Sequence, residues 1–145
     1  MARENDPYSG FRYNVAFGDI TAGFSECTGL TSETAIIEYR NGNEKNPATV
    51  RKLPGLTTFT NITLKRGMTK GLELWQWYQK TAAGTTERRE GTIVLLDEAG
   101  EQVLKWSVTQ CWACKWEGPA LNATANEVAI ETLAIACEGL KLEAV

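Results

Sequence analysis

The feature that most constrains the fold of this chain is the alternation of apolar and polar residues along several short segments. In FRYNVAF (residues 11–17), aromatic or aliphatic residues occupy every second position. Successive side chains of a β-strand point to opposite faces, so this period of two predicts a half-buried strand. Further strands are predicted in the segments 23–27, 33–40, 59–66, 91–110 (a hairpin with Gly100 in its turn) and 126–143. The sequence therefore predicts a mainly β protein, built as a barrel or a sandwich.

A single segment, TKGLELWQWYQKTAAG, has the spacing of an amphipathic helix. Apolar residues at positions i, i+3 and i+4 lie on one face of a helix, and Thr69 is suited to an N-cap. We predict one helix over about residues 70–82, flanking the sheet. The residues predicted to pack it onto the sheet are Leu74, Trp77 and Tyr78.

Two other segments affect the expected organisation. NGNEKNPATVRKLPG (residues 41–55) is rich in Asn, Gly, Pro and Lys, which predicts a long loop. NEVAIETLAIACEGLKLE (126–143) is predicted as one long strand, with either a bulge or two covered faces, because its apolar residues change parity. With 145 residues and no linker-like tract, the chain is expected to form a single domain over residues 1–145.

The motif CWACKW (residues 111–116) contains a C-x-x-C spacing, which occurs in redox sites and zinc sites. A structural zinc site needs four ligands, and the other two thiols, Cys27 and Cys137, are isolated in a chain without histidine. A redox C-x-x-C begins a helix, whereas this one continues a strand. In an extended strand Cys111 and Cys114 lie on opposite faces about 10 Å apart. We therefore expect reduced thiols, no metal site, and Trp112 and Trp116 on a shared face.

The composition argues against several classes of function. The absence of histidine excludes Ser-His-Asp and Cys-His catalysis, so no catalytic residue and no cofactor is expected. A net charge of −3 is unlike that of most nucleic-acid-binding domains. The sequence contains no run of about 18 apolar residues and no signal-peptide pattern, so we expect no membrane segment and a cytoplasmic site of synthesis.

The order of several motifs resembles the tail tube family, whose members form the inner tube of contractile phage tails and phage-tail-like injection systems. The resemblance covers about residues 6–141. It rests on DPYSGFRYNVAFGD, RKLPGLTTFTNITLKRG and KWEGPALNATANEVAIETLAIACEGL, and its most specific parts are the KLPG and NITLKRG pair and the ending with GP, NEVAIE and EGL. Two places differ from the pattern of the family: this chain reads QCWACKW where relatives commonly read NAW-P before the KW pair, and ACEGL has Cys137 where many relatives have histidine.

The resemblance implies a structural protein that assembles into hexameric rings, and rings that stack into a hollow tube inside a contractile sheath. The implied partners are sheath subunits, baseplate or hub proteins, cap or terminator proteins, and a lumen content of effector cargo or tape-measure protein. DNA is implied as a passenger only in a phage tail. Assembly is expected in the cytoplasm, within a particle that is released or forms part of a virion.

The resemblance also implies two groups of site residues. The loop 41–55 corresponds to the part of relatives that reaches the neighbouring ring, which makes Tyr39, Arg40, Lys52, Leu53, Pro54 and Gly55 the ring-stacking candidates. A polar strand face is expected to line the lumen, with Glu38, Arg40, Asn61, Thr63, Lys65 and Glu131 as candidates.

Two other functions fit the sequence less directly. One is a secreted hexameric ring of the type VI secretion class, a more distant relative, acting as an effector carrier. The other is a small ligand-binding β-barrel that uses its aromatic residues; binding of a small ligand by the monomer would distinguish it from a tube subunit.

Overall fold

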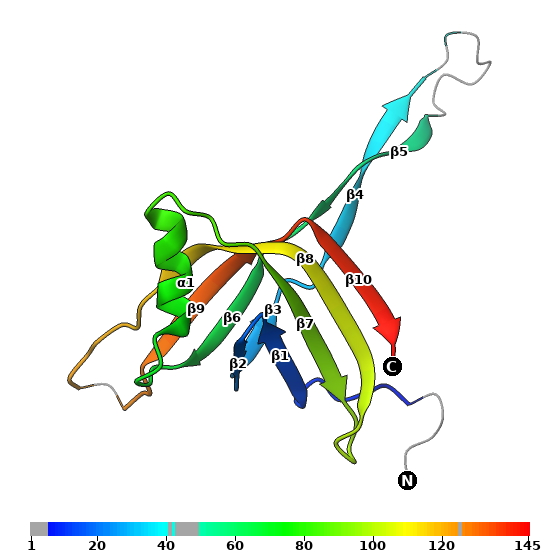
Figure 1. Ribbon diagram of the computed structural model, residues 1–145. Coiled ribbons are helices and arrows are strands. Elements are labelled where there is room, and N and C mark those ends of the chain that lie inside the picture. Colours follow the sequence, from blue (N-terminus) through cyan, green and yellow to red (C-terminus); the bar gives the residue numbers. More distant parts are fainter. Residues whose placement is uncertain (1–5, 41, 43–49, 125) are drawn as a thin grey trace.

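The computed structural model describes residues 6–40, 42, 50–124 and 126–145 (Figure 1). Within these residues the chain forms ten strands and one helix. In chain order they are β1 (Tyr13–Phe17), β2 (Ile20–Ala22), β3 (Glu26–Thr28), β4 (Ser32–Tyr39), β5 (Arg51–Phe59), β6 (Ile62–Gly67), α1 (Glu73–Ala82), β7 (Arg89–Leu96), β8 (Gln102–Glu117), β9 (Ile130–Ala136) and β10 (Gly139–Ala144). The prediction of a mainly β protein with one helix is confirmed.

The strands form an eight-stranded antiparallel sheet and a separate two-stranded hairpin. The sheet has the order β2-β1-β7-β8-β9-β6-β3, and β10 also pairs with β8. Its path ends in β2 and β3, so the sheet of the described residues does not close into a barrel. Figure 1 shows β8 as a long curved strand that passes from one half of the sheet to the other.

The core lies on one face of the curved sheet, where alternate residues of each strand are buried. In β6 Ile62 and Leu64 are buried, and in β9 Leu133 and Ile135 are buried. Helix α1 packs against β8 and adds Leu74 and Trp77 to this core. The alternation that predicted strands therefore also identified the buried face, because period-two patterns place apolar residues on one side of a sheet.

Two predicted elements differ from the structure. The segment 126–143 begins as a strand only at Ile130 and is divided into β9 and β10, which both pair with β8. The predicted loop 41–55 is wrong for residues 51–55, which belong to β5 and pair with β4. Residues 41 and 43–49 of that loop lie outside the described residues.

The helix begins later than predicted. Leu72 occupies the N-cap position, and the Thr69 hydroxyl instead accepts a hydrogen bond from the Gly71 N–H (3.2 Å). At the other end Ala83 is the C-cap and Gly84 follows with φ +92°, the left-handed conformation that glycine adopts readily.

The CWACKW motif lies within β8, as expected for a strand. The register between β8 and β9 shifts between Ala113 and Lys115, so Cys114 is an extra residue in a bulge. Beyond the bulge, the residues that face the core change from odd-numbered to even-numbered positions. Trp116, the register partner of Leu133, therefore faces the core, whereas Trp112, the register partner of Ala136, faces away from it. The prediction that Trp112 and Trp116 share a face is therefore wrong.

Candidate assembly surfaces

The hairpin formed by β4 and β5 projects away from the sheet (Figure 1). Its register pairs Tyr39 with Arg51, Glu38 with Lys52, and Ile37 with Leu53. A bulge near Ala35 interrupts the register between Thr34 and Ile36. A single two-stranded ribbon is marginally stable in water, so this hairpin is held in place by what covers it or by its attachment to the sheet.

The hairpin carries apolar side chains on its exposed surface. Ile36 is 64% exposed and Leu56 is 82% exposed, values that are far above those of a buried core. The other large apolar residues that are exposed on the hairpin are Ile37, Tyr39 and Leu53. Exposed apolar residues on a protruding strand pair favour a surface that a partner covers, because such a surface otherwise promotes aggregation.

The six predicted ring-stacking residues fall on or next to this hairpin. Tyr39 is in β4, and Lys52, Leu53, Pro54 and Gly55 are in β5, while Arg40 directly follows β4. Pro54 pairs with Ile36. Within the described residues the other edge of β5 pairs with no strand, and proline, which has no backbone N–H to donate, is tolerated in such an edge strand. The structure thus places these residues together on one protruding element.

The residues predicted to face a lumen fall in two separate places. Asn61, Thr63 and Lys65 lie on the exposed face at the start of β6 and along it, alternating with buried core residues. Lys65 also forms an ion pair with Glu26 of β3 (3.7 Å). Glu38 and Arg40, by contrast, lie on the hairpin.

Glu131 does not belong to either group. Its side chain is only 1% exposed and shares the core face of β9 with Leu133 and Ile135. The prediction that Glu131 faces a lumen is therefore wrong. The signal was present in the sequence, because Glu131 has the same strand parity as these two apolar residues.

Glu131 is paired with Arg66, its register partner on β6. The Arg66 Nε–H donates to Glu131 Oε1 (2.7 Å), and Arg66 Nη2 donates to Glu73 Oε2 (2.9 Å) and to the Gly71 carbonyl (3.2 Å). Burial alone lowers the pKa of Arg66, but the hydrogen bonds to Glu73 and Glu131 outweigh it, so its pKa is raised. One guanidinium therefore joins two strands and the start of α1.

The three residues predicted to pack α1 onto the sheet lie on its inner face. Leu74 and Trp77 are each 1% exposed, and Tyr78 is partly buried and packs against the same core. The Trp77 ring lies 5.7 Å from that of Phe17, and its Nε1–H donates to the Glu87 carbonyl (2.9 Å). The sequence reasoning missed Trp116, whose ring meets Trp75 edge-on at 5.0 Å.

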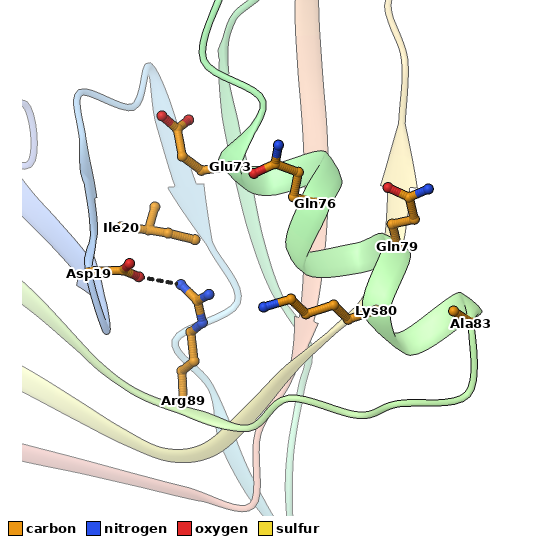
Figure 2. A pocket seen from close by; sticks show the side chains of 8 residues that line it. All are labelled: Asp19, Ile20, Glu73, Gln76, Gln79, Lys80, Ala83 and Arg89. Atoms are coloured by element: carbon orange, nitrogen blue, oxygen red, sulfur yellow. Dashed lines mark hydrogen bonds and ion pairs between the residues drawn. The ribbon is translucent and has the colours of Figure 1, made fainter.

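A cavity of about 570 Å³ lies between α1, the β1–β2 turn and the start of β7, as Figure 2 shows. Its lining residues are Asp19, Ile20, Glu73, Gln76, Gln79, Lys80, Ala83 and Arg89. The charged ones are held in ion pairs: Arg89 with Asp19 (2.8 Å) and Glu87, Lys80 with Glu87, and Glu73 with Arg66.

These ion pairs also fix the ionisation of the carboxyls. The Arg66 hydrogen bond lowers the pKa of Glu73, and the Lys80 hydrogen bond lowers the pKa of Glu87. Both groups are therefore carboxylates at neutral pH, which suits recognition of a polar partner surface more than proton transfer.

No helix in the described part of the chain is long and apolar enough to cross a membrane. No curated protein matches the sequence.

Solved structures with the same fold include components of contractile particles. A chain of the PVC sheath–tube complex, an extracellular contractile injection system in the extended state, has a TM-score of 0.88 and 28% identity, over 98% of this chain and 95% of that chain. A chain of the anti-feeding prophage cap has a TM-score of 0.88 and 26% identity, over 100% and 96% of the two chains. Hcp1 from Flavobacterium johnsoniae shares the fold, with a TM-score of 0.55 and 13% identity over 92% and 95%.

Residues 9–141, nearly the whole chain, match one protein family directly. That range includes the β4–β5 hairpin, helix α1 and every strand of the sheet up to the start of β10. The chain belongs to the family of the T4-like virus tail tube protein gp19.

Proposed function

We propose that this protein is the inner-tube subunit of an extracellular contractile injection system or of a contractile phage tail. The observation that carries the proposal is the family match over residues 9–141, supported by the likeness to a chain of a sheath–tube complex over 98% of this sequence. The chain acts as one tail tube domain and performs no catalysis. It is a rigid part of the tube, which the contracting sheath drives through a target envelope.

The subunits assemble into hexameric rings, and the rings stack into a tube. The open ends of the sheet support ring formation, because β2, β3 and β10 each present an edge that a neighbouring copy can pair with. The hairpin supports contact beyond one ring, because it extends apolar residues away from the body of its own chain (Figure 1). We assign Tyr39, Arg40, Lys52, Leu53, Pro54 and Gly55 to the contact between stacked rings.

The tube lumen carries the cargo. We assign the exposed face of β6, with Asn61, Thr63 and Lys65, to the lumen wall, because a polar face lets cargo slide without apolar adhesion. The sheath, a baseplate and a terminating cap are the partners, since the similar solved chains come from a sheath–tube complex, a cap and a baseplate. The particle assembles in the cytoplasm, with protein effectors or a tape-measure protein in the lumen.

The assembly state tests this proposal. We expect purified protein at high concentration to form rings with a mass near six times 16.0 kDa, and tubes in the electron microscope. The variant Leu53→Asp/Leu56→Asp places two charges on the hairpin and is expected to abolish tubes. Leu72→Asp is the matched control, because Leu72 is also an exposed apolar residue but lies beside α1.

A strictly monomeric protein that also fails to associate with its sheath and baseplate partners would contradict the proposal. Tubes formed equally well by the hairpin variant would leave the tube role intact but remove the assignment of the hairpin. The contents of isolated particles distinguish the two settings, because a phage tail passes DNA and an injection system passes protein.

A further inference from the structure

Two cysteines that are far apart in the sequence lie opposite each other in the sheet. The register pairs Trp112 with Ala136 on one side, and Thr109 with Gly139 on the other. Between these pairs each strand has two residues, so Cys111 stands across from Cys137 at the junction of β9 and β10. The C-x-x-C partner Cys114 is elsewhere, in the bulge, where its Sγ–H donates to the Ala134 carbonyl (3.4 Å).

The two thiols are on the same side of the sheet. Cys111 is 0% exposed within the core, and Cys137 is partly buried against that core. Burial, together with smaller contributions from the neighbouring Cys137 and Glu90 side chains, raises the pKa of Cys111 to about 12. The contribution of Cys137 to the Cys111 pKa is consistent with the proximity that the register requires.

The backbone spacing suits a disulfide. Opposed residues of antiparallel strands have Cα atoms about 4.5–5.5 Å apart, and disulfides span about 4.4–6.8 Å. The Sγ of Cys137 lies 3.9 Å from the Thr60 carbonyl oxygen on the β6 side. A disulfide with Cys111 would require the Cys137 side chain to turn about its χ1 bond.

We propose that Cys111 and Cys137 are a modification site, at which an intramolecular disulfide joins β8 to the β9–β10 junction. The oxidant is a low-molecular-weight disulfide such as oxidised glutathione. The Cys137 thiolate attacks one of its sulfurs and releases one glutathione thiol. Cys111 then loses its proton and displaces the second glutathione, so two protein thiols become one disulfide and two glutathione thiols form.

Cys137 reacts first because it is the accessible member of the pair. The bond closes a loop that runs from β8 through β9. It lowers the conformational entropy of the unfolded chain and therefore raises thermal stability. Its place in the life of the particle rests on the proposed function, since a particle released from the cell moves from a reducing to an oxidising environment. The subunit is thus synthesised with both cysteines reduced, and the disulfide forms after release.

The test uses the full-length protein as a single chain, before any ring assembly. The reduced protein is incubated with oxidised glutathione at about pH 8.5, where thiol exchange is faster. We expect the count of free thiols to fall from four to two, a peptide that links Cys111 to Cys137 in mass spectrometry, and a melting temperature higher by about 5–10 °C. Cys27→Ser and Cys114→Ser are matched controls that retain the link.

Cys137→Ser is expected to keep its three thiols and its original melting temperature under the same treatment. The proposal is overturned if the unaltered chain yields no Cys111–Cys137 peptide, if Cys111 links to Cys114, or if Cys137 remains joined to glutathione. The peptide map of the unaltered chain decides the matter even if substitution of the buried Cys111 prevents folding. Ring formation is measured separately, so a failure here leaves the proposed function standing.

Discussion

At the scale of single residues, the buried ion pair of Arg66 and Glu131 is the feature with the largest expected effect. Both side chains are buried, and Glu131 is 1% exposed. Removing one partner leaves an uncompensated charge in the core, which typically costs about 3–5 kcal/mol. We expect Arg66→Met to lower the free energy of unfolding by about that amount, measured by urea denaturation.

The double variant Arg66→Met/Glu131→Leu removes both charges and keeps similar volumes. It is expected to recover most of the lost stability, because two apolar residues replace the pair. Lys65→Met serves as the surface control: its pair with Glu26 is exposed and contributes at most about 1 kcal/mol. If the double variant were as unstable as the single one, the shape of the pair rather than its charge would be responsible.

The carboxyl of Glu73 gives this cluster a dependence on pH. The hydrogen bond from Arg66 lowers the pKa of Glu73 below its ordinary value of 4.5. A group with a lowered folded-state pKa stabilises the folded protein above its unfolded-state pKa, and this stabilisation is lost as the pH falls through the folded-state pKa. Glu73→Gln is therefore expected to lower the melting temperature at neutral pH and to have a steadily smaller effect as the pH is lowered below the ordinary value of about 4.5.

Melting curves over this pH range check the effect, with Glu98→Gln as a control in the exposed β7–β8 turn. Equal melting temperatures of the Glu73→Gln variant and the parent at every pH would show that the Arg66 contact does not stabilise the fold.

At the scale of elements, β7 passes so close to its neighbours that only glycine fits at position 91. A Cβ at Gly91 would lie 2.6 Å from Phe17 Cδ1 of β1 and 2.8 Å from Val108 Cγ2 of β8. Gly91→Ala is expected to destabilise the protein by about 1–3 kcal/mol through overpacking. Gly10→Ala, where no atom lies within 4 Å, is the control, and calorimetry on both variants measures the difference.

The elements also show how far sequence reasoning reached. The alternation of apolar and polar residues predicts strands correctly where one face of the strand is buried, as in β6 with Ile62 and Leu64. It failed for β5, because both faces of the hairpin are exposed and Pro54 and Gly55 are typical of loops. It also failed at Cys114, since a bulge inverts parity without a local signal in the residues around it.

The same limit applies to the candidate sites. The stacking candidates came from the resemblance and fall together on one hairpin, although nothing in residues 39–55 alone distinguishes a protruding strand pair from a loop. Glu131 is a charged residue at a core position of its strand, so its charge and its parity predict opposite faces. The partner that neutralises it, Arg66, is 65 residues away in sequence and becomes a neighbour only through the β6–β9 pairing.

At the scale of the whole molecule, the hairpin and the sheet have separate roles, and this separation can be tested. The core residues belong to the sheet and to α1, whereas β4 has no buried residue. Ser32 and Phe59 are register partners at the base of the hairpin, so a short Gly-Ser link in place of residues 33–58 can join them without moving the sheet. We expect this deletion to change the melting temperature by only a few degrees.

The same deletion is expected to abolish tubes, because it removes the exposed apolar surface that lies outside the body of the subunit. Calorimetry measures the first outcome, and electron microscopy with light scattering measures the second. A shortened chain that unfolds would show that the hairpin is part of the core, against its burial pattern. A shortened chain that still forms long tubes would place the ring contacts on the sheet edges alone. A hairpin dedicated to contacts between subunits is supported only if the shortened chain folds and no longer assembles.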